Sequence, residues 1–458
     1  MMTAHTPTGA VQVGYAAADI TPTMPVQLIG FAREDDTSRG VLEPLVAQVL
    51  LFDQDGDRCC LVTLDLLGLT QQLGDRLRDE LAQLLCCARS QVMLCCSHTH
   101  SGPDCAAAPA YYRFLCRQVS GAARAALQDL APAAGAWAVV RAAIGQNRRG
   151  DGPVDDRIGA LKLARPGRPD LLLIRLTAHP NVLTWENRRI SPDYFGAVRR
   201  QLGTQLGAEV LVTQGAAGNI RPAFRWHRAN YLETHPLQKA ALARTPQLML
   251  EIERDSLAAL ERMAAAVAAA LAPAVTALPL RPLQVVRMVS DWLDCTSPVP
   301  DPQQERAIAD EAWTMGQVPA AGWRAEIARL RRSGVAVQHT PVELQFLQID
   351  GGCLCGTICE AMCELALEAA ELADDELLFF GGYTGGCSGY LPDAAEYDRG
   401  GYEVLWSMLL YYPYHGRVMP LDRDTGHRLA VRAAACWRAL RAGGPLPPQP
   451  STEPSANT

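Results

Sequence analysis

Two histidines, His98 and His100, are the residues whose types and spacing best support chemistry in this sequence. They follow the apolar run 92–96, typical of a buried strand, and precede Ser101-Gly102-Pro103, which predicts the end of that strand. Because side chains two residues apart on a strand point the same way, we expect both imidazoles at its exposed end. Neutral imidazole is the commonest metal ligand, but a histidine pair at such a junction is equally compatible with ordinary hydrogen bonds.

Further polar side chains follow other predicted strands. They are Asp65, His179, Asn219, Glu360 and Tyr390. A catalytic zinc site needs about three nitrogen or oxygen ligands and an open position for water, and this set offers candidates. We expect Glu360 to begin a helix after a strand that contains Cys353 and Cys355, where its carboxylate would also suit the helix dipole.

The elements that must position these residues alternate along the chain. Apolar runs predict strands near 47–52, 59–64, 91–96, 171–176, 209–213, 278–289, 335–349 and 376–380. Helical periodicity is found near 73–87, 111–129, 194–206 and 251–271, and a loop rich in glycine and tyrosine covers 381–402. This alternation predicts an α/β fold of layered mixed sheets flanked by helices, with the site on loops at strand ends.

We expect one large domain over residues 13–442, with a polar helical insert at about 302–332. Residues 1–12 and the Pro/Ser/Thr-rich tail 443–458 are predicted to be disordered.

The composition argues against some classes of partner. A formal net charge of −7 and the lack of a basic run argue against nucleic acid. The most apolar helical stretch, 263–275, is too short to span a bilayer, so we expect no stable membrane insertion. The first residues lack the pattern of a signal peptide, and we therefore expect a cytoplasmic protein.

The 15 cysteines are expected to be reduced in that compartment. The spacing of Cys353, Cys355, Cys359 and Cys363 matches no zinc knuckle or ribbon. We expect the first two on a strand and the last two on the following helix, all in the core.

Several short motifs occur in an order that is similar to one known family. They are Gly14–Pro22, Leu64–Leu69, His98–Pro103, Asn147–Arg149, Ala178–Pro180, Gln214–Pro222 and Gly389–Pro392 followed by Gly401–Glu403. Together they resemble the neutral/alkaline non-lysosomal ceramidases, and the resemblance runs from about residue 12 to 440.

This resemblance implies a zinc-dependent amidase. The implied zinc ligands are His98, His179, Glu360 and Tyr390, and the implied catalytic groups around the scissile carbonyl are His100, Arg148 and Tyr402. In such a site Zn²⁺ lowers the pKa of its water toward about 7. The zinc ion, His100, Arg148 and Tyr402 then stabilise the oxyanion that forms from the scissile carbonyl, each by roughly 3 kcal/mol. Of these groups, His100 is the best candidate to protonate the leaving amine.

Three departures from the family bear on the substrate. Arg221 stands where lipid-cleaving members carry a serine, and Cys359 replaces the glycine before Glu360. We interpret Arg221 and Asn219 as substrate-binding candidates; Arg221 could hold a carboxylate or phosphate, or be turned to solvent or ion-paired. The signal peptide and C-terminal β-sandwich of secreted ceramidases have no counterpart here, which favours a smaller cytosolic amide over ceramide.

We therefore expect a zinc amidohydrolase that cleaves a small N-acyl amine, one that can carry an anionic group. Two alternatives stay open. The same site could catalyse acyl transfer, condensation, or ester or lactone hydrolysis, because the same donors serve all acyl transfers. The chain could also be a non-catalytic binding protein on this scaffold. A site of nitrogen and oxygen donors also admits metals other than zinc, and the sequence does not indicate an oligomeric state.

Overall fold

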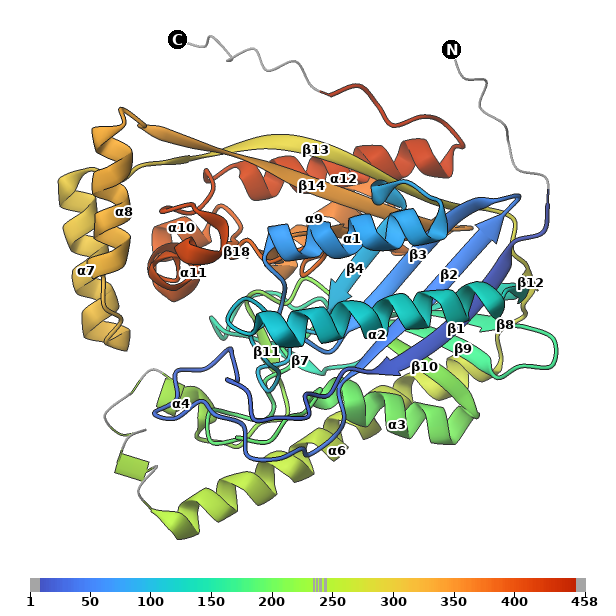
Figure 1. The fold of residues 1–458 in the computed structure, drawn as a ribbon, viewed down its shortest axis with the longest axis horizontal. Coiled ribbons are helices and arrows are strands. Elements are labelled where there is room, and N and C mark those ends of the chain that lie inside the picture. The colour runs from blue at the N-terminus through green and yellow to red at the C-terminus, as the bar shows by residue number, and fades with distance from the viewer. Residues whose placement is uncertain (1–8, 234, 236–237, 239–240, 243–244, 450–458) are drawn as a thin grey trace.

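The computed structural model describes residues 9–233, 235, 238, 241–242 and 245–449. Three sheets surround a shared apolar core, and each sheet carries helices on its outer face (Figure 1). The core between the sheets contains side chains from all three, such as Leu61, Leu173 and Leu354. The predicted α/β architecture of mixed sheets flanked by helices is confirmed.

The first sheet has the strand order β4-β3-β2-β1-β5. Its strands are β1 (Gln12–Asp19), β2 (Val46–Gln54), β3 (Asp57–Leu64), β4 (Val92–Cys96) and β5 (Ala131–Pro132). The strands β2 and β3 form a hairpin, and its two-residue turn places Asp55 and Gly56 at positive φ, as a type I′ turn requires. Helices α1 (Gln71–Leu85) and α2 (Pro109–Gln128) cover the outer face, and the short η1 (Arg89–Gln91) leads into β4.

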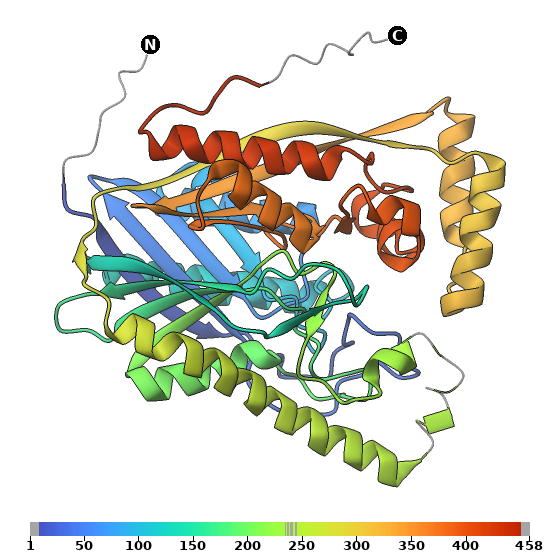
Figure 2. The same ribbon diagram turned by 180° about the vertical axis from the view of Figure 1, so that it is seen from behind.

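The second sheet has the order β10-β9-β8-β6-β12. Its strands are β6 (Ala134–Arg141), β8 (Arg157–Ala164), β9 (Asp170–Leu176), β10 (Ala208–Gln214) and β12 (Arg281–Pro282). Helices α3 (Tyr194–Leu206) and α6 (Pro246–Thr276) pack on its outer face, as the view from behind shows (Figure 2). By length and composition α6 is able to cross a membrane, but half of its apolar stretch is buried in the protein.

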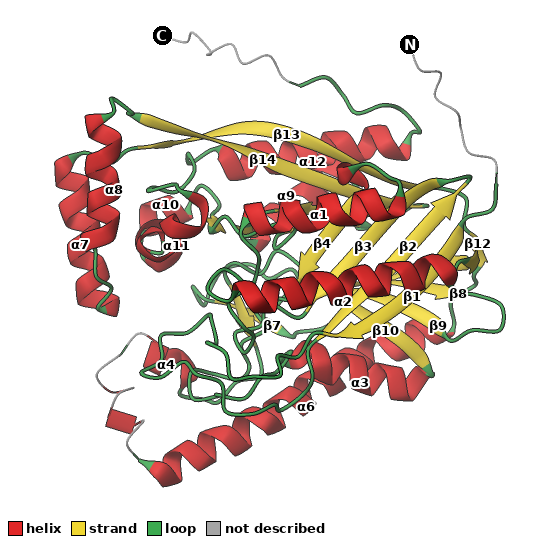
Figure 3. Cartoon of the chain, in the orientation of Figure 1, coloured by secondary structure: helices red, strands yellow, loops and turns green. Residues whose placement is uncertain are grey.

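The third sheet has the order β13-β14-β15-β17. Its strands are β13 (Val286–Pro298), β14 (Val337–Ile349), β15 (Gly352–Thr357) and β17 (Leu378–Gly381), and α9 (Cys363–Ala373) and α12 (Thr425–Arg441) cover it. The segment between β13 and β14 forms two helices, α7 (Pro302–Gly316) and α8 (Ala321–Arg332), at the far end of the long hairpin (Figure 3). Asp301 caps α7 by accepting hydrogen bonds from the N–H groups of Gln303 and Gln304.

Short elements connect these layers. They are the ribbon of β7 (Gly145–Asn147) with β11 (Ile220–Pro222), the pair β16 (Glu360–Ala361) and β18 (Tyr390–Leu391), and the helices α4 (Ala229–Glu233), α10 (Glu396–Arg399), η2 (Tyr402–Trp406) and α11 (Met408–His415). The loop expected over 381–402 therefore contains β18 and α10, and η2 begins at Tyr402. Of these short elements, β16 follows directly on β15 and pairs with β18.

Three local predictions are wrong. The strand β4 agrees with the one expected at 91–96, but the two histidines lie in the segment after it rather than at its end, and His98 adopts a φ of +69° that no strand accommodates. Glu360 lies on β16 rather than at the start of a helix, and α9 begins only at Cys363. Cys359 consequently lies in the bend before β16 and not on a helix.

The predicted termini fall mainly outside the described residues, which exclude 1–8 and 450–458. The described part of the tail lies against α12, where the carbonyls of Pro447 and Pro448 accept hydrogen bonds from Arg432.

Candidate functional site

His98 and His179 converge from two different sheets. His98 follows β4, and its Nδ1 lies 2.7 Å from the carbonyl oxygen of Leu67. His179 follows β9, and its Nδ1 lies 2.8 Å from the carbonyl oxygen of Ala217. A carbonyl can only accept, so each Nδ1 carries the proton and each Nε2 keeps its lone pair. Metal-binding histidines are oriented by contacts of this kind.

Glu360 joins these imidazoles from β16, which follows the third sheet's strand β15 in the chain. Its side chain is fully buried, and its Oε2 lies 3.2 Å from Nε2 of His98 and 3.8 Å from Nε2 of His179. Its Oε1 accepts a hydrogen bond of 2.9 Å from the hydroxyl of Tyr411 on α11. A buried carboxylate against two imidazole lone pairs is unfavourable unless a cation lies between them.

The polar atoms that face this point lack other partners. Nε2 of His179, Oε2 of Glu360 and both ring nitrogens of His100 are buried and make no hydrogen bond. The ligand atoms of His98, His100 and His179 lie within 4.8 Å of one another, the only such group found among the described residues. These donors fit a zinc ion, which takes histidine nitrogen and carboxylate oxygen at about 2.0–2.2 Å.

His100 lies beside both histidines, but a turn rather than a strand brings it there. Its ring lies 5.2 Å from the rings of His98 and His179, and 4.7 Å from the ring of Phe31. Gly30, at a φ of +106°, packs so closely on this ring that a Cβ there would lie 2.6 Å from its Cγ. The site therefore requires glycine at position 30.

Burial is the main cause that lowers the pKa values of His100 and His179 well below the usual range. Neighbouring positive charge adds to the effect for both imidazoles, from Arg148 and, at His100, also from Arg33 and Arg225. Both imidazoles are consequently neutral at pH 7, which is the form that binds metal or accepts a proton.

Three tyrosines line the site from the C-terminal segment. Tyr390 pairs with Glu360 across β16 and β18, and its ring contacts those of Tyr402 and Tyr411 at 5.7 and 6.2 Å. Burial, followed by the charge of Glu360, raises the pKa of all three hydroxyls. They are therefore protonated at neutral pH and available as hydrogen-bond donors.

Arg148 lies at the same side of the site as Tyr402. Its Nη1 donates to Oε1 of Glu403 at 2.7 Å, which ties the end of β7 to the π-helical turn η2. Burial is the largest single influence on the pKa of Glu403 and raises it, but the charge and hydrogen bond of Arg148, a backbone hydrogen bond and the charge of Arg149 together make the net shift downward. Because Glu403 directly follows Tyr402 in the chain, this ion pair holds Arg148 and Tyr402, two of the predicted catalytic residues, close together.

The predicted substrate-binding residues lie in different environments. Asn219 donates to Oε2 of Glu364 at 2.7 Å and accepts from the N–H of Cys363, so it holds the start of α9. Its contact with the substrate stays a prediction. Arg221 lies on β11 opposite Gln146 and is partly exposed.

Asp65, another candidate from the sequence, is committed to an ion pair with Arg199 at 2.5 Å. The structure also brings in groups that sequence reasoning missed. The ring of Tyr383 lies 4.5 Å from that of His98, and its buried hydroxyl has no hydrogen-bond partner. In the sequence, the glycine pairs on either side of Tyr383-Thr384 were the available signal for this residue. In the structure, Tyr383 adopts a φ of +60°. Tyr411, Phe31 and Arg33 were likewise missed, because they approach from distant segments.

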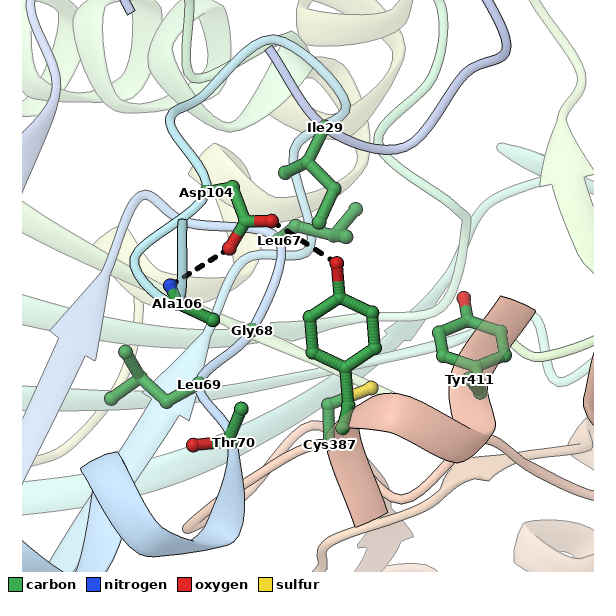
Figure 4. A pocket seen from close by; sticks show the side chains of 10 residues that line it. Ile29, Leu67, Gly68, Leu69, Thr70, Asp104, Ala106, Cys387 and Tyr411 are labelled. Carbon is green, nitrogen blue, oxygen red and sulfur yellow. Dashed lines mark hydrogen bonds between the residues drawn. The ribbon is translucent and has the colours of Figure 1, made fainter. Parts of the chain in front are cut away.

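A narrow apolar pocket adjoins the site (Figure 4). Its cavity volume is about 30 Å³, and its walls include Ile29, Leu67 and Tyr411. Asp104 lies at its edge and accepts hydrogen bonds from the N–H of Ala106 and the hydroxyl of Tyr414. A volume of this size holds about two water molecules.

Two comparisons with known proteins bear on the family and the fold. Residues 11–150 match the family described as neutral/alkaline non-lysosomal ceramidase, N-terminal, which confirms the resemblance found in the motifs. The fold is similar to the crystal structure of neutral ceramidase from Pseudomonas aeruginosa, with a TM-score of 0.68, 16% identity, and coverage of 96% of this chain and 75% of that chain. A ceramidase complexed with C2 gives a TM-score of 0.68 at 15% identity, covering 98% of this chain and 78% of the other.

No curated protein matches this sequence. The family match supports an amide hydrolase of the ceramidase type.

Proposed function

We propose that this protein is a zinc-dependent amidohydrolase that cleaves a small N-acyl amine in the cytoplasm. The observation that carries the proposal is the convergence of His98, His179 and Glu360, with both Nδ1 atoms held by backbone carbonyls. A zinc ion held by these residues, with Tyr390 as the fourth proposed ligand, would supply a Lewis acid and a water of lowered pKa.

The protein's own side chains account for the remaining chemistry. Arg148 and Tyr402, linked through Glu403, are proposed to donate to the carbonyl oxygen as negative charge develops on it. Neutral His100 takes a proton from the attacking water and delivers it to the leaving nitrogen. The C–N bond breaks, and a carboxylic acid and an amine leave.

The dimensions of the neighbouring pocket support a small substrate. A cavity of about 30 Å³ beside Tyr411 has room for a group of only a few atoms. All fifteen cysteines are unpaired, which supports a reducing compartment.

A panel of N-acyl amines of increasing chain length tests the proposal. Purified protein should release acid and amine from short members, lose activity with a chelator and regain it with Zn²⁺. His98→Ala should abolish the reaction, whereas His339→Ala, at an exposed position on β14, should not. Retained activity in His98→Ala would overturn the proposal, and products formed with a competing amine would show acyl transfer instead.

A further inference from the structure

Positive charge gathers on one side of the site, around His100. Three guanidinium groups, those of Arg33, Arg148 and Arg225, act on its imidazole. Arg33 is the most closely attached, because its Nη2 donates to the backbone carbonyl of His100 at 2.9 Å. Its guanidinium also lies over the ring of Phe31, which itself packs on His100.

These three arginines are committed to different degrees. Arg148 has an ion pair with Glu403 at 2.7 Å, and Arg225 donates to the amide oxygen of Asn230 at 2.7 Å. Arg33 has only the backbone bond to His100 among its hydrogen bonds in the described structure, and its Nε and Nη1 are buried without a partner.

A guanidinium with two buried donor atoms that make no hydrogen bond is unfavourable in this state. Burial lowers the pKa of Arg33 to about 10, although the charges of Glu186 and Asp36 partly counter the effect. Glu186 makes its hydrogen bonds with Thr184 and Ser256, and it therefore does not satisfy Arg33 directly. An anion that accepts from Nε or Nη1 would satisfy these donors, and a carboxylate is the acceptor that guanidinium matches best.

The position of Arg33 fixes which part of the substrate carries the anion. His100 is the group that passes a proton to the leaving nitrogen in the proposed function, on which this inference rests. Arg33 is bonded to the backbone of that same residue and comes from the loop between β1 and β2. This β1–β2 loop is fixed to the loop after β4 that carries His98 and His100 (the histidine loop), because the N–H of Ile29 donates to the carbonyl of Gly102. An anion bound by Arg33 therefore lies on the amine side of the scissile bond.

We propose that the substrate is an N-acyl amino acid or a close relative, with a carboxylate on its amine portion, and that Arg33 binds this carboxylate. The short acyl group occupies the opposite side of the scissile bond. Arg225 and Arg148 add to the positive field that attracts an anionic substrate.

A matched pair of substrates tests the charge requirement. N-acetylglycine and N-acetylglycinamide have nearly the same size, but only the first carries a carboxylate. The zinc-loaded wild-type protein should cleave N-acetylglycine with a kcat/KM at least about tenfold higher, the effect expected for one charge-assisted hydrogen bond. This preference should fall as salt is raised.

The variant Arg33→Gln removes the charge, and Arg39→Gln is its control. Arg39 lies in the same loop with its side chain 66% exposed and paired with Asp35. Arg33→Gln should raise KM for N-acetylglycine about tenfold or more, with little change in kcat and no change for the carboxamide, and Arg33→Lys should restore part of the loss. Arg39→Gln should behave as wild type. Equal cleavage of both substrates by wild type, or an unchanged KM in Arg33→Gln, would overturn the inference and leave the proposed amidase intact.

Binding to zinc-free protein separates this inference from the proposed function. Titration calorimetry with N-acetylglycine should show binding to zinc-free wild type that is lost in Arg33→Gln and absent for the carboxamide. This result would support the anion site even if neither compound were hydrolysed, which would count against the amidase alone. Binding that is equal in wild type and Arg33→Gln would overturn the anion site.

Discussion

The inner and outer parts of the site are built by different means. In the inner part, His98, His179 and Glu360 are buried, and backbone carbonyls and the Tyr411 hydroxyl orient them. In the outer part, around His100 and Arg33, guanidinium groups produce a positive electrostatic potential, and the ring of Phe31 packs under the guanidinium of Arg33. The inner part is the set of residues that the proposed amidase needs for any amide. The outer part is where this chain can express a substrate preference of its own.

The largest expected effect comes from breaking the inner part. His179→Ala removes one proposed metal ligand and leaves His98 and Glu360 with fewer partners to hold the metal. Loss of the chemistry that the metal supplies, worth several kcal/mol, should reduce kcat/KM by about 10³-fold or more. Steady-state kinetics on the best short amide measures the loss. A His427→Ala control, at an exposed position on α12, should be neutral; near-normal activity in His179→Ala would contradict the role of the inner part.

The boundary between the two parts should show the next largest effect. Tyr402→Phe removes one proposed donor to the developing oxyanion and leaves the histidines untouched. We expect kcat to fall by about 10²- to 10³-fold with zinc content unchanged. Tyr397→Phe is a matched control, because its hydroxyl bonds the carbonyl of Leu421 away from the site. A fall in zinc content in Tyr402→Phe would instead place this tyrosine in the inner part.

Removing the hydrogen bond that orients Glu360 should have a smaller effect on the inner part. Tyr411→Phe deletes the hydrogen bond to Oε1 of Glu360 and keeps the ring. Loss of a hydrogen-bond partner of a metal ligand typically changes metal affinity by about 10- to 100-fold. Competition with a chromogenic chelator would measure this change. An unchanged zinc affinity would show that Glu360 is held by its strand alone.

The smallest expected effect is on stability. The pKa values of His100, His179 and the buried His415 are lowered in the folded protein, mainly by burial. Below a pH of about 6.5, the unfolded chain binds protons that the folded chain does not bind. The free energy of unfolding of zinc-free protein should therefore fall as the pH decreases from about 7.5 to 5.5. Urea unfolding at these pH values measures the slope, which His415→Gln should reduce; a rise in stability on acidification would contradict the burial of these imidazoles in neutral form.

The sequence predicts the inner part better than the outer part. The α/β layers follow from local patterns, and His98 and His179 stand in motifs that can be found one at a time, whereas Glu360 is indicated by its place after a predicted strand. Their common meeting point depends on three strands that end at one place, which no single motif contains. The reasoning about His98 and His100 illustrates this limit, because the two rings do come together but through a turn at positive φ.

The residues that were missed lack a local signal. Arg33, 67 residues before His100 in the chain, becomes a neighbour only when the β1–β2 loop packs on the histidine loop. Tyr411 is one of several tyrosines in its segment, and only packing of α11 selects it for Glu360. Asn219 shows the reverse case, where a motif position is taken up by the start of α9.

Metal content tests the central claim most directly. Elemental mass spectrometry would be applied to protein purified without chelators, with wild type beside the double variant His98→Ala/His179→Ala. We predict about one zinc per chain in wild type and none in the variant, with both proteins folded by circular dichroism. Wild-type protein that binds no metal, even after incubation with Zn²⁺, would contradict the account and favour a binding protein on this scaffold.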